Sequence, residues 1–349
     1  MRYPENLHPG GTIGFVAPSL GCATEPYKSA FQNAQKILTE IGYSLDLGPN
    51  CYAAEGIGIS NSPKACAEEL EIWYARPQND VLISCGGGEL MNETISAVDF
   101  TRIAQAKPKW YMGYSDNTNM VFLLTTLCDT AAVYGPCAGT FGMEPWHESV
   151  MDALQILTGE RDTVCGYDLW EKERQKCEEN PLLPYKVEEK RISFAYPNGR
   201  NMLTEGETLR MSGRLLGGCL DVLVNICGTR FDHVEEFVHK YREDGIVWFL
   251  EACDLNVFAI RRALWQLKEA GWFRNARGFL IGRPGTFGQE IFGLDQYQAV
   301  LGVLGDLGLP VIMDLDIGHL PPMMPLIVGS MADVRFCNNE IRIQMKKVL

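Results

Sequence analysis

A serine at the junction of a buried strand and a helix is the first residue whose setting suggests chemistry. Ser115 lies in the segment KWYMGYSDNTNMVFLLTT, just after its aromatic, strand-like half and before a half with helical spacing of apolar residues. A serine on such a corner projects its hydroxyl away from the sheet, toward the free N–H groups of the helix start. The pattern predicts a nucleophile, although it lacks the last glycine of G-x-S-x-G. A serine that only caps the helix is the alternative.

A run of three glycines follows a second buried strand. Asp80 to Cys85 is a continuous apolar run typical of parallel sheets, and it leads into Gly86 to Gly88. Backbone N–H groups in such a loop can stabilise a developing oxyanion beside Ser115, while the alternative is a tight turn that needs glycines with positive φ. A dinucleotide fingerprint needs a third glycine where Met91 stands, so we predict no nucleotide cofactor.

A nucleophilic serine needs a base, and a third group usually orients that base. Of the five histidines, His319 alone follows a strand and lies in an irregular loop, DLDIGHLPP. Glu251 directly follows the buried run IVWFL, where an unpartnered carboxylate is costly. We therefore expect His319 to be the base and Glu251 its acid, with Asp314 and Asp316 as alternative acids. The other role for Glu251 is a salt bridge to an arginine such as Arg261.

The composition limits the classes of protein to consider. The chain has 349 residues, the length of about two domains, with 46% hydrophobic and 21% charged residues, as in a globular enzyme. A net charge of −13 argues against a nucleic-acid partner, which needs clustered Lys and Arg. The twelve cysteines are scattered and form no C-x-x-C pair, and no His-x-x-x-His spacing occurs, so we predict free thiols and no metal site.

The N-terminal sequence, MRYPENLHPGG, has no apolar leader, and no apolar run approaches the length of a membrane span. We therefore expect a cytoplasmic protein without a membrane partner.

Strands and helices alternate over residues 1–157, which predicts an open, mostly parallel, Rossmann-like sheet with flanking helices. From 158 to 210, charges and prolines replace any clear period, so this segment is expected to be an inserted linker or lid. Residues 211–349 predict a second α/β domain with mixed strands. Its last part alternates apolar and polar residues around Asn338 and Asn339, which is typical of a hairpin.

Six motifs, taken in order along the chain, resemble the LD-carboxypeptidase family of serine peptidases, which includes the microcin C self-immunity peptidases. They are TIGFVAPS, the glycine loop after DVLISC, GYSDNT, GRLLGGCLDVL, the FLE strand end and DIGH. The resemblance spans nearly the whole chain. It implies a two-domain α/β protein that is a homodimer, has a Ser-Glu-His triad and needs no metal or cofactor.

The resemblance also assigns individual roles. Ser115 matches the nucleophile, Glu251 the orienting acid and His319 the base. The backbone N–H groups of Gly87 and Asp116 match the oxyanion hole.

The substrate is left open by the resemblance. One family branch trims murein tetrapeptides at an L-to-D bond, and a longer branch cleaves aminoacyl or peptidyl sulfamoyl nucleotides. The long insert between Ser115 and Glu251 resembles the longer branch. Where that branch tends to carry an aromatic that stacks on the ligand, this chain has Cys177, and Trp170 is the only tryptophan in the insert. Gly86, Trp170 and Cys177 are the candidate substrate contacts.

We therefore predict an amide hydrolase that works through an acyl-enzyme and takes a small peptide or an aminoacyl nucleotide as its substrate. An α/β-hydrolase esterase is one alternative, because it shares the chain order Ser, acid, His. A non-catalytic ligand-binding α/β protein, in which Ser115 only caps a helix, is the other.

Overall fold

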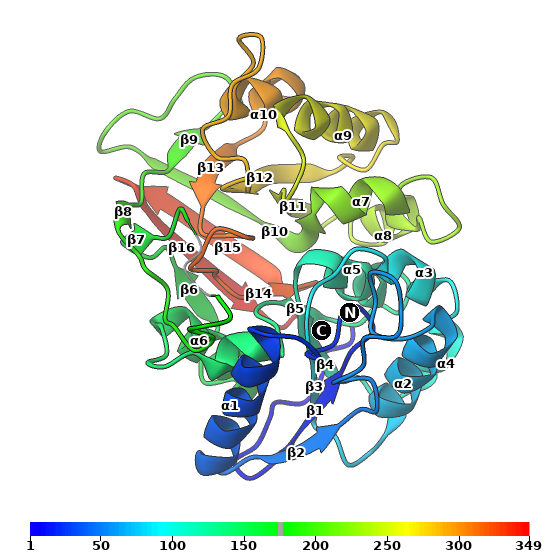
Figure 1. Ribbon diagram of the computed structural model, residues 1–349. Coiled ribbons are helices and arrows are strands. Elements are labelled where there is room, and N and C mark those ends of the chain that lie inside the picture. The colour runs from blue at the N-terminus through cyan, green and yellow to red at the C-terminus, as the bar shows by residue number, and fades with distance from the viewer. Residues whose placement is uncertain (174–176, 349) are drawn as a thin grey trace. The chain divides into compact units, whose positions relative to one another are not determined.

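The computed structural model describes residues 1–173 and 177–348, which form two compact units (Figure 1). The N-terminal unit contains residues 1–161 and the described part of 173–186, and the C-terminal unit contains 162–172 and 187–348. Each unit has its own sheet, which confirms the predicted two-domain α/β class. The stretch from 158 to 210 contributes to both units, and its role as a linker or lid stays a prediction.

The sheet of the N-terminal unit contains parallel strands in the order β5-β4-β3-β1-β2. The sequence predicted the strands that lead into Gly86 and Ser115, β3 and β4, but it gave no signal for β2, whose SLDL sequence is short and lacks a continuous apolar run. The strands are β1 (Thr12–Val16), β2 (Ser44–Leu47), β3 (Val81–Ser84), β4 (Trp110–Gly113) and β5 (Ala132–Tyr134).

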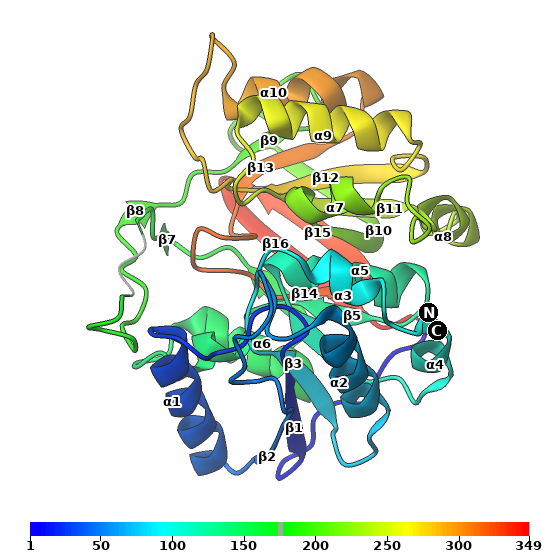
Figure 2. The same cartoon turned by 45° about the vertical axis from the view of Figure 1, so that its right-hand side comes forward.

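Helices cover both faces of this sheet, with α1 and α2 on opposite sides (Figure 2). The strand order explains this, because β2 and β3 lie on opposite sides of β1 and right-handed crossovers to them must use opposite faces. The helical elements of this unit are α1 (Tyr27–Glu40), α2 (Pro63–Ala75), α3 (Met91–Ile95), α4 (Phe100–Gln105), η1 (Ser115–Asn117), α5 (Thr118–Thr126), η2 (Ala138–Gly142) and α6 (Glu148–Thr158).

The sheet of the C-terminal unit is mixed, as predicted. Its described strands follow the order β6-β16-β15-β10-β11-β12-β13-β9, with parallel strands from β10 to β13 and antiparallel pairs outside them. The strands are β6 (Thr163–Cys165), β9 (Phe194–Tyr196), β10 (Thr208–Cys219), β11 (Ile246–Glu251), β12 (Ala276–Gly282), β13 (Val311–Leu315), β15 (Met331–Cys337) and β16 (Glu340–Lys346). The remaining strands are β7 (Leu169–Trp170), β8 (Glu189–Lys190) and β14 (Leu326–Val328).

Helices α7, α9 and α10 pack side by side in this unit (Figures 1 and 2). The predicted hairpin is confirmed, because Asn338 and Asn339, at φ values of 47° and 66°, turn β15 into β16. None of the described helices combines the length and the apolar character needed to cross a membrane. The helical elements are α7 (Leu220–Ile226), α8 (Val234–Lys240), α9 (Val257–Glu269), α10 (Gln296–Leu304) and η3 (Gly305–Leu307).

Candidate active site

Ser115 follows β4 and opens η1 on a strained backbone. Its φ is 63°, a left-handed value that residues other than glycine rarely adopt. The N-cap of η1 is Tyr114 and that of α5 is Asn117, so Ser115 caps neither helix. A serine held in this conformation between a strand and a helix has the backbone of a nucleophile elbow.

The glycine loop after β3 approaches Ser115 closely. A Cβ built on Gly87 would lie 3.2 Å from both Cβ and Oγ of Ser115. None of Gly86 to Gly88 has a positive φ, so at Gly87 close approach to Ser115, and not turn geometry, favours a glycine. Within the described residues, the N–H of Gly87 donates no hydrogen bond and is available to an oxyanion. Asn117 fixes the loop, because its Nδ2 donates to the Gly86 carbonyl at 2.7 Å.

The Asp116 side chain anchors the same corner. Its Oδ2 accepts hydrogen bonds from Ser19 Oγ at 2.6 Å and from the Met91 backbone N–H at 2.9 Å. Asn119 Nδ2 donates to Oδ1 at 3.1 Å. Burial raises the pKa of the Asp116 carboxyl, while the bond from Ser19 acts in the opposite direction. The Asp116 carboxylate therefore holds this corner together through hydrogen bonds, and the oxyanion role expected of its backbone N–H stays a prediction.

In the C-terminal unit, Glu251 ends β11 and His319 lies in the loop after β13, and the two side chains meet. His319 Nδ1 lies 2.8 Å from Glu251 Oε2, and both residues are buried. A carboxylate at this distance orients the ring and favours a proton on Nδ1, which leaves Nε2 as the basic nitrogen. Arg261, the alternative partner for Glu251, donates to the carbonyl of Gln298.

The alternative acids are committed to other groups. Asp314 accepts hydrogen bonds from Gln296 at 2.8 Å and Tyr297 at 2.5 Å, and burial raises its pKa to about 6. Asp316 forms a buried ion pair with Arg283, although burial still raises its pKa. Of the three acids that the sequence offered, Glu251 is therefore the one hydrogen-bonded to the histidine ring.

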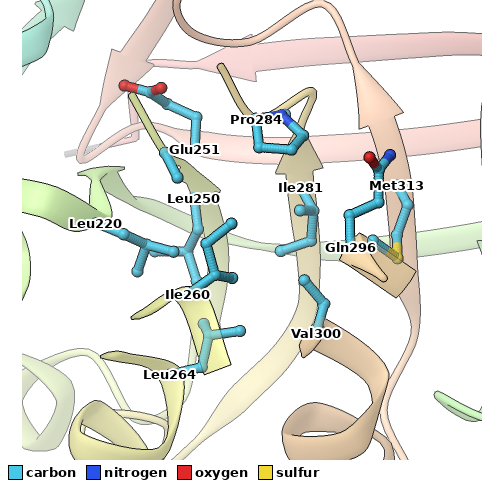
Figure 3. A pocket seen from close by; sticks show the side chains of 12 residues that line it. Leu220, Leu250, Glu251, Ile260, Leu264, Ile281, Pro284, Gln296, Val300 and Met313 are labelled. Carbon is cyan, nitrogen blue, oxygen red and sulfur yellow. The ribbon is translucent and has the colours of Figure 1, made fainter. Parts of the chain in front are cut away.

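A small apolar cavity lies behind the strand end that carries Glu251 (Figure 3). Its volume is about 20 Å³, room for roughly one water and too small for a substrate. Figure 3 shows the Glu251 carboxylate at the edge of the group, directed away from Leu264 and Ile260. Apolar surroundings lower the local dielectric constant, which strengthens the hydrogen bond between Glu251 and His319.

Cys219, at the end of β10, is in register with Glu251 on the neighbouring strand. Cys219, Glu251 and His319 each offer a ligand atom, and these atoms lie within 4.8 Å of one another, so together they could hold a metal ion. Burial, and then the charge of Glu251, raise the pKa of the Cys219 thiol well above its usual range, so the thiol stays protonated and is not a candidate nucleophile.

The candidate substrate contacts in the insert have different surroundings. Trp170 is buried in the C-terminal unit, where Phe287 lies 5.0 Å from its ring and Arg283 lies over its face at 4.7 Å. Cys177 is exposed and forms a single antiparallel bridge with Asn180. Trp170 thus has a packing role, and a role in substrate binding stays a prediction for both residues.

Comparison with known proteins identifies the family. Residues 13–135 match the LD-carboxypeptidase N-terminal domain, and residues 212–334 match the LD-carboxypeptidase C-terminal domain. Together these matches cover more than half of the chain. The chain belongs to the LD-carboxypeptidase family of peptidases, which confirms the resemblance found in the sequence.

Individual relatives cover the chain almost completely. The microcin C7 self-immunity protein MccF of Escherichia coli is 26% identical, over 96% of this chain and 93% of its own. A probable murein peptide carboxypeptidase of Bacillus subtilis is 23% identical, over 94% and 90%. The structure of MccF in complex with glutamyl sulfamoyl guanosine has a TM-score of 0.80 at 22% identity and covers 99% of each chain. At this identity, the structural match establishes a shared fold.

Proposed function

We propose that this protein is a serine peptidase that cleaves an amide bond through an acyl-enzyme, with Ser115, His319 and Glu251 as its triad. The observation that carries the proposal is the 2.8 Å contact between His319 and Glu251 at two strand ends. The strained corner at Ser115 and membership of a peptidase family support it.

In the proposed mechanism, His319 takes the proton of the Ser115 hydroxyl, and the alkoxide attacks the substrate carbonyl. The N–H groups of Gly87 and Asp116 hold the oxyanion of the tetrahedral intermediate. His319 then returns the proton to the leaving amine, and the acyl-enzyme forms. Water, activated by the same histidine, releases the acyl group, and Glu251 stabilises the imidazolium at both steps.

The substrate is proposed by chemical class. Relatives include a self-immunity protein solved with an aminoacyl sulfamoyl nucleotide and a probable murein peptide carboxypeptidase. We therefore propose either an L,D-murein tetrapeptide or an aminoacyl or peptidyl nucleotide. Mass spectrometry of the products from a murein tetrapeptide and, separately, from an aminoacyl sulfamoyl adenosine tests this. If neither compound is cleaved while Ser115 reacts with a probe, the substrate class is wrong.

Two alternatives predict different results. An esterase of the α/β-hydrolase type would turn over simple ester substrates far faster than the amides. A ligand-binding protein would leave Ser115 unlabelled by a fluorophosphonate probe, because only an activated serine reacts with it. The positive φ of Ser115, and the fact that it caps neither helix, favour labelling.

We also propose that the protein is a cytoplasmic homodimer without a nucleic-acid partner. The family resemblance motivates the dimer, and the net charge of −13 makes binding to a polyanion unfavourable. Light scattering after size-exclusion chromatography measures the oligomeric state, and a monomer at micromolar concentration would contradict the dimer.

Removing divalent metal should leave the rate unchanged. The proposed mechanism takes its nucleophile, base and oxyanion donors from protein groups, so no step needs a Lewis acid. We expect that EDTA does not lower kcat and that Mg²⁺ does not raise it. A loss in EDTA that a divalent ion restores would overturn the mechanism.

Gly318→Ala should damage the pair of Glu251 and His319. Gly318 has a φ of 106°, and a Cβ there would lie 2.5 Å from Glu251 Oε2. The methyl group must displace the carboxylate, so kcat should fall by about 100-fold, the effect expected for a misplaced catalytic group. Steady-state kinetics, with thermal unfolding alongside, measure it.

Gly308→Ala is the matched control for this change. Gly308 also has a positive φ, 65°, but a Cβ on it would meet nothing within 4 Å. It should lower the free energy of unfolding by about 1 to 2 kcal/mol, the cost of placing an L-residue in the left-handed region, and leave kcat unchanged. Equal losses of kcat in both variants would mean that the contact with Glu251 is not responsible.

The segment from 158 to 210 is proposed to be a lid that determines which substrate is cleaved. Within it, Trp170 and Tyr196 are buried. Residues 177–181 belong to the connection between β7 and β8 and can be removed without shortening either strand. Removing 177–181 should change kcat/KM for the peptide and the nucleotide conjugate unequally, while labelling by a small fluorophosphonate stays constant.

A variant that replaces 177–181 with glycine and serine at constant length separates the side chains from the length of the segment. The lid hypothesis expects both variants to alter the ratio of kcat/KM between the two substrates. Equal losses for the peptide, the conjugate and the probe would indicate damage to the fold, and the lid hypothesis would then be dropped.

A further inference from the structure

The proposed mechanism gives no role to one buried side chain that can bind a metal. Cys219 ends β10 directly beside Glu251, and the three ligand atoms of Cys219, Glu251 and His319 lie within 4.8 Å of one another. A thiol, a carboxylate and an imidazole form a ligand set that zinc uses in proteins, and three protein ligands leave a fourth position for water. No other group of three such residues was found among the described residues.

We propose that Cys219, Glu251 and His319 form an inhibitory binding site for Zn²⁺ or another thiophilic divalent cation. The proposed cation joins the imidazole to the carboxylate and the thiolate, and so takes the place of the proton between His319 and Glu251. Binding itself depends only on these three side chains. That binding inhibits the enzyme rests on the proposed function, in which His319 is the base.

The geometry needs small movements only. Zinc holds nitrogen and oxygen at about 2.0 to 2.2 Å and sulfur at about 2.3 Å, so tetrahedral ligand atoms lie roughly 3.2 to 3.6 Å apart. His319 Nδ1 and Glu251 Oε2, now at 2.8 Å, must separate by about half an ångström. Cys219 Sγ, which now lies 3.3 Å from Asp221 Oδ2, must turn toward them.

Zinc binding changes the protonation of Cys219 and of the His319 ring. Zinc displaces the thiol proton of Cys219 to solvent, because the thiolate is the ligand. When zinc binds Nδ1 of His319, the ring proton moves to Nε2. The ring then has no free nitrogen to accept a proton from a serine.

The cation selectivity follows from the ligands. Thiolate and imidazole favour Zn²⁺ and Cd²⁺, while Mg²⁺ and Ca²⁺ prefer sites made entirely of oxygen. The burial of all three residues, with exposed fractions of 1% for Cys219, 1% for Glu251 and 8% for His319, makes the histidine side the most open route for an ion.

Binding is tested first without any assay of turnover. The metal-free full-length protein is titrated with Zn²⁺ against a chromophoric chelator and with Co²⁺, whose thiolate complex absorbs light. Cys219→Ser is the test variant, because serine is nearly isosteric but a poor ligand, and Cys165→Ser, at an exposed cysteine, is the matched control. Ser115→Ala is included because its metal binding does not depend on catalysis.

We expect one zinc equivalent and a cobalt–thiolate band in the parent, in Ser115→Ala and in Cys165→Ser. In Cys219→Ser the band should disappear, and zinc affinity should fall at least about tenfold, the size of effect seen even for groups outside the first coordination shell. Equal zinc affinity in Cys219→Ser and the parent, or no cysteine-dependent band in Ser115→Ala, would overturn the site. Thermal unfolding of Cys219→Ser checks that the variant is folded.

Inhibition is tested second, with each variant compared to its own metal-free rate. Zn²⁺ should inhibit the parent and Cys165→Ser, EDTA should restore both, and Cys219→Ser should need at least tenfold more zinc. Zinc bound at Cys219 without any effect on turnover would support the site but overturn the role of His319 as base. Absent binding, with Ser115→Ala still inactive, would overturn the metal site and leave the proposed function intact.

Discussion

Ser115→Ala is expected to remove turnover, with a loss of about 10⁴ to 10⁶ in kcat, as in other serine hydrolases that lose the nucleophile. The alanine keeps the Cβ that lies against Gly87 and loses only the hydroxyl, so the corner should hold its conformation. Steady-state kinetics on the cleaved substrate and covalent labelling with a fluorophosphonate measure the effect.

The control for Ser115→Ala is a measurement of its thermal stability. Alanine and serine pay a similar cost at a φ of 63°, so the melting temperature should stay close to that of the parent. Activity within tenfold of the parent would end the assignment of Ser115 as nucleophile, whatever the melting temperature.

His319 provides the coupled test. Because a nucleophile and its base act as one unit, His319→Ala should cost about as much as Ser115→Ala, and the double variant should cost little more than either. A double variant whose loss equals the product of the single losses would show that the two residues act independently.

Both sheets could be predicted because strands and helices alternate in chain order and their apolar runs have clear periods. Ser115, Glu251 and His319 could be proposed as site residues for the same reason, since each follows a buried strand, where an α/β fold keeps its chemistry. The sequence favoured Glu251 as the acid because it directly follows a buried strand, but it could not exclude Asp314 and Asp316. Those alternatives lost support only when their partners, Tyr297 and Arg283, were known.

Other features gave no sequence signal because they depend on which chain segments meet. The carboxylate of Asp116 binds Ser19 and the N–H of Met91, which come from two other loops. The cluster of Cys219, Glu251 and His319 joins the ends of β10 and β11 to the loop after β13. Its residues are far apart in the sequence, so no short ligand spacing indicates a metal site. Strands β6 to β9 arise in the charged insert, where partners in the sheet, and not periodicity, select the extended backbone.

Glu251→Gln should lower kcat by roughly 10³ to 10⁴, the loss expected when the acid that holds a catalytic histidine becomes an amide. The glutamine fits the same space, so the ring stays close to its position. Its neutral amide cannot stabilise the imidazolium, and its NH₂ group can donate to Nδ1, which holds the ring proton on Nε2, the wrong nitrogen for a base. Steady-state kinetics should show this loss in kcat, and thermal unfolding should show an unchanged melting temperature.

Asp316→Asn is the matched comparison, because it makes the same chemical change at a buried acid three residues before His319 in sequence. Here the expected effect is on stability, since Arg283 loses its buried partner, and breaking such a pair costs about 3 to 5 kcal/mol. The two variants should therefore differ in kind: Glu251→Gln loses rate and keeps stability, while Asp316→Asn loses stability and keeps most of its rate per folded molecule. If Asp316→Asn abolishes the rate and Glu251→Gln is mild, the acid of the triad is Asp316, and the contact between Glu251 and His319 serves the fold alone.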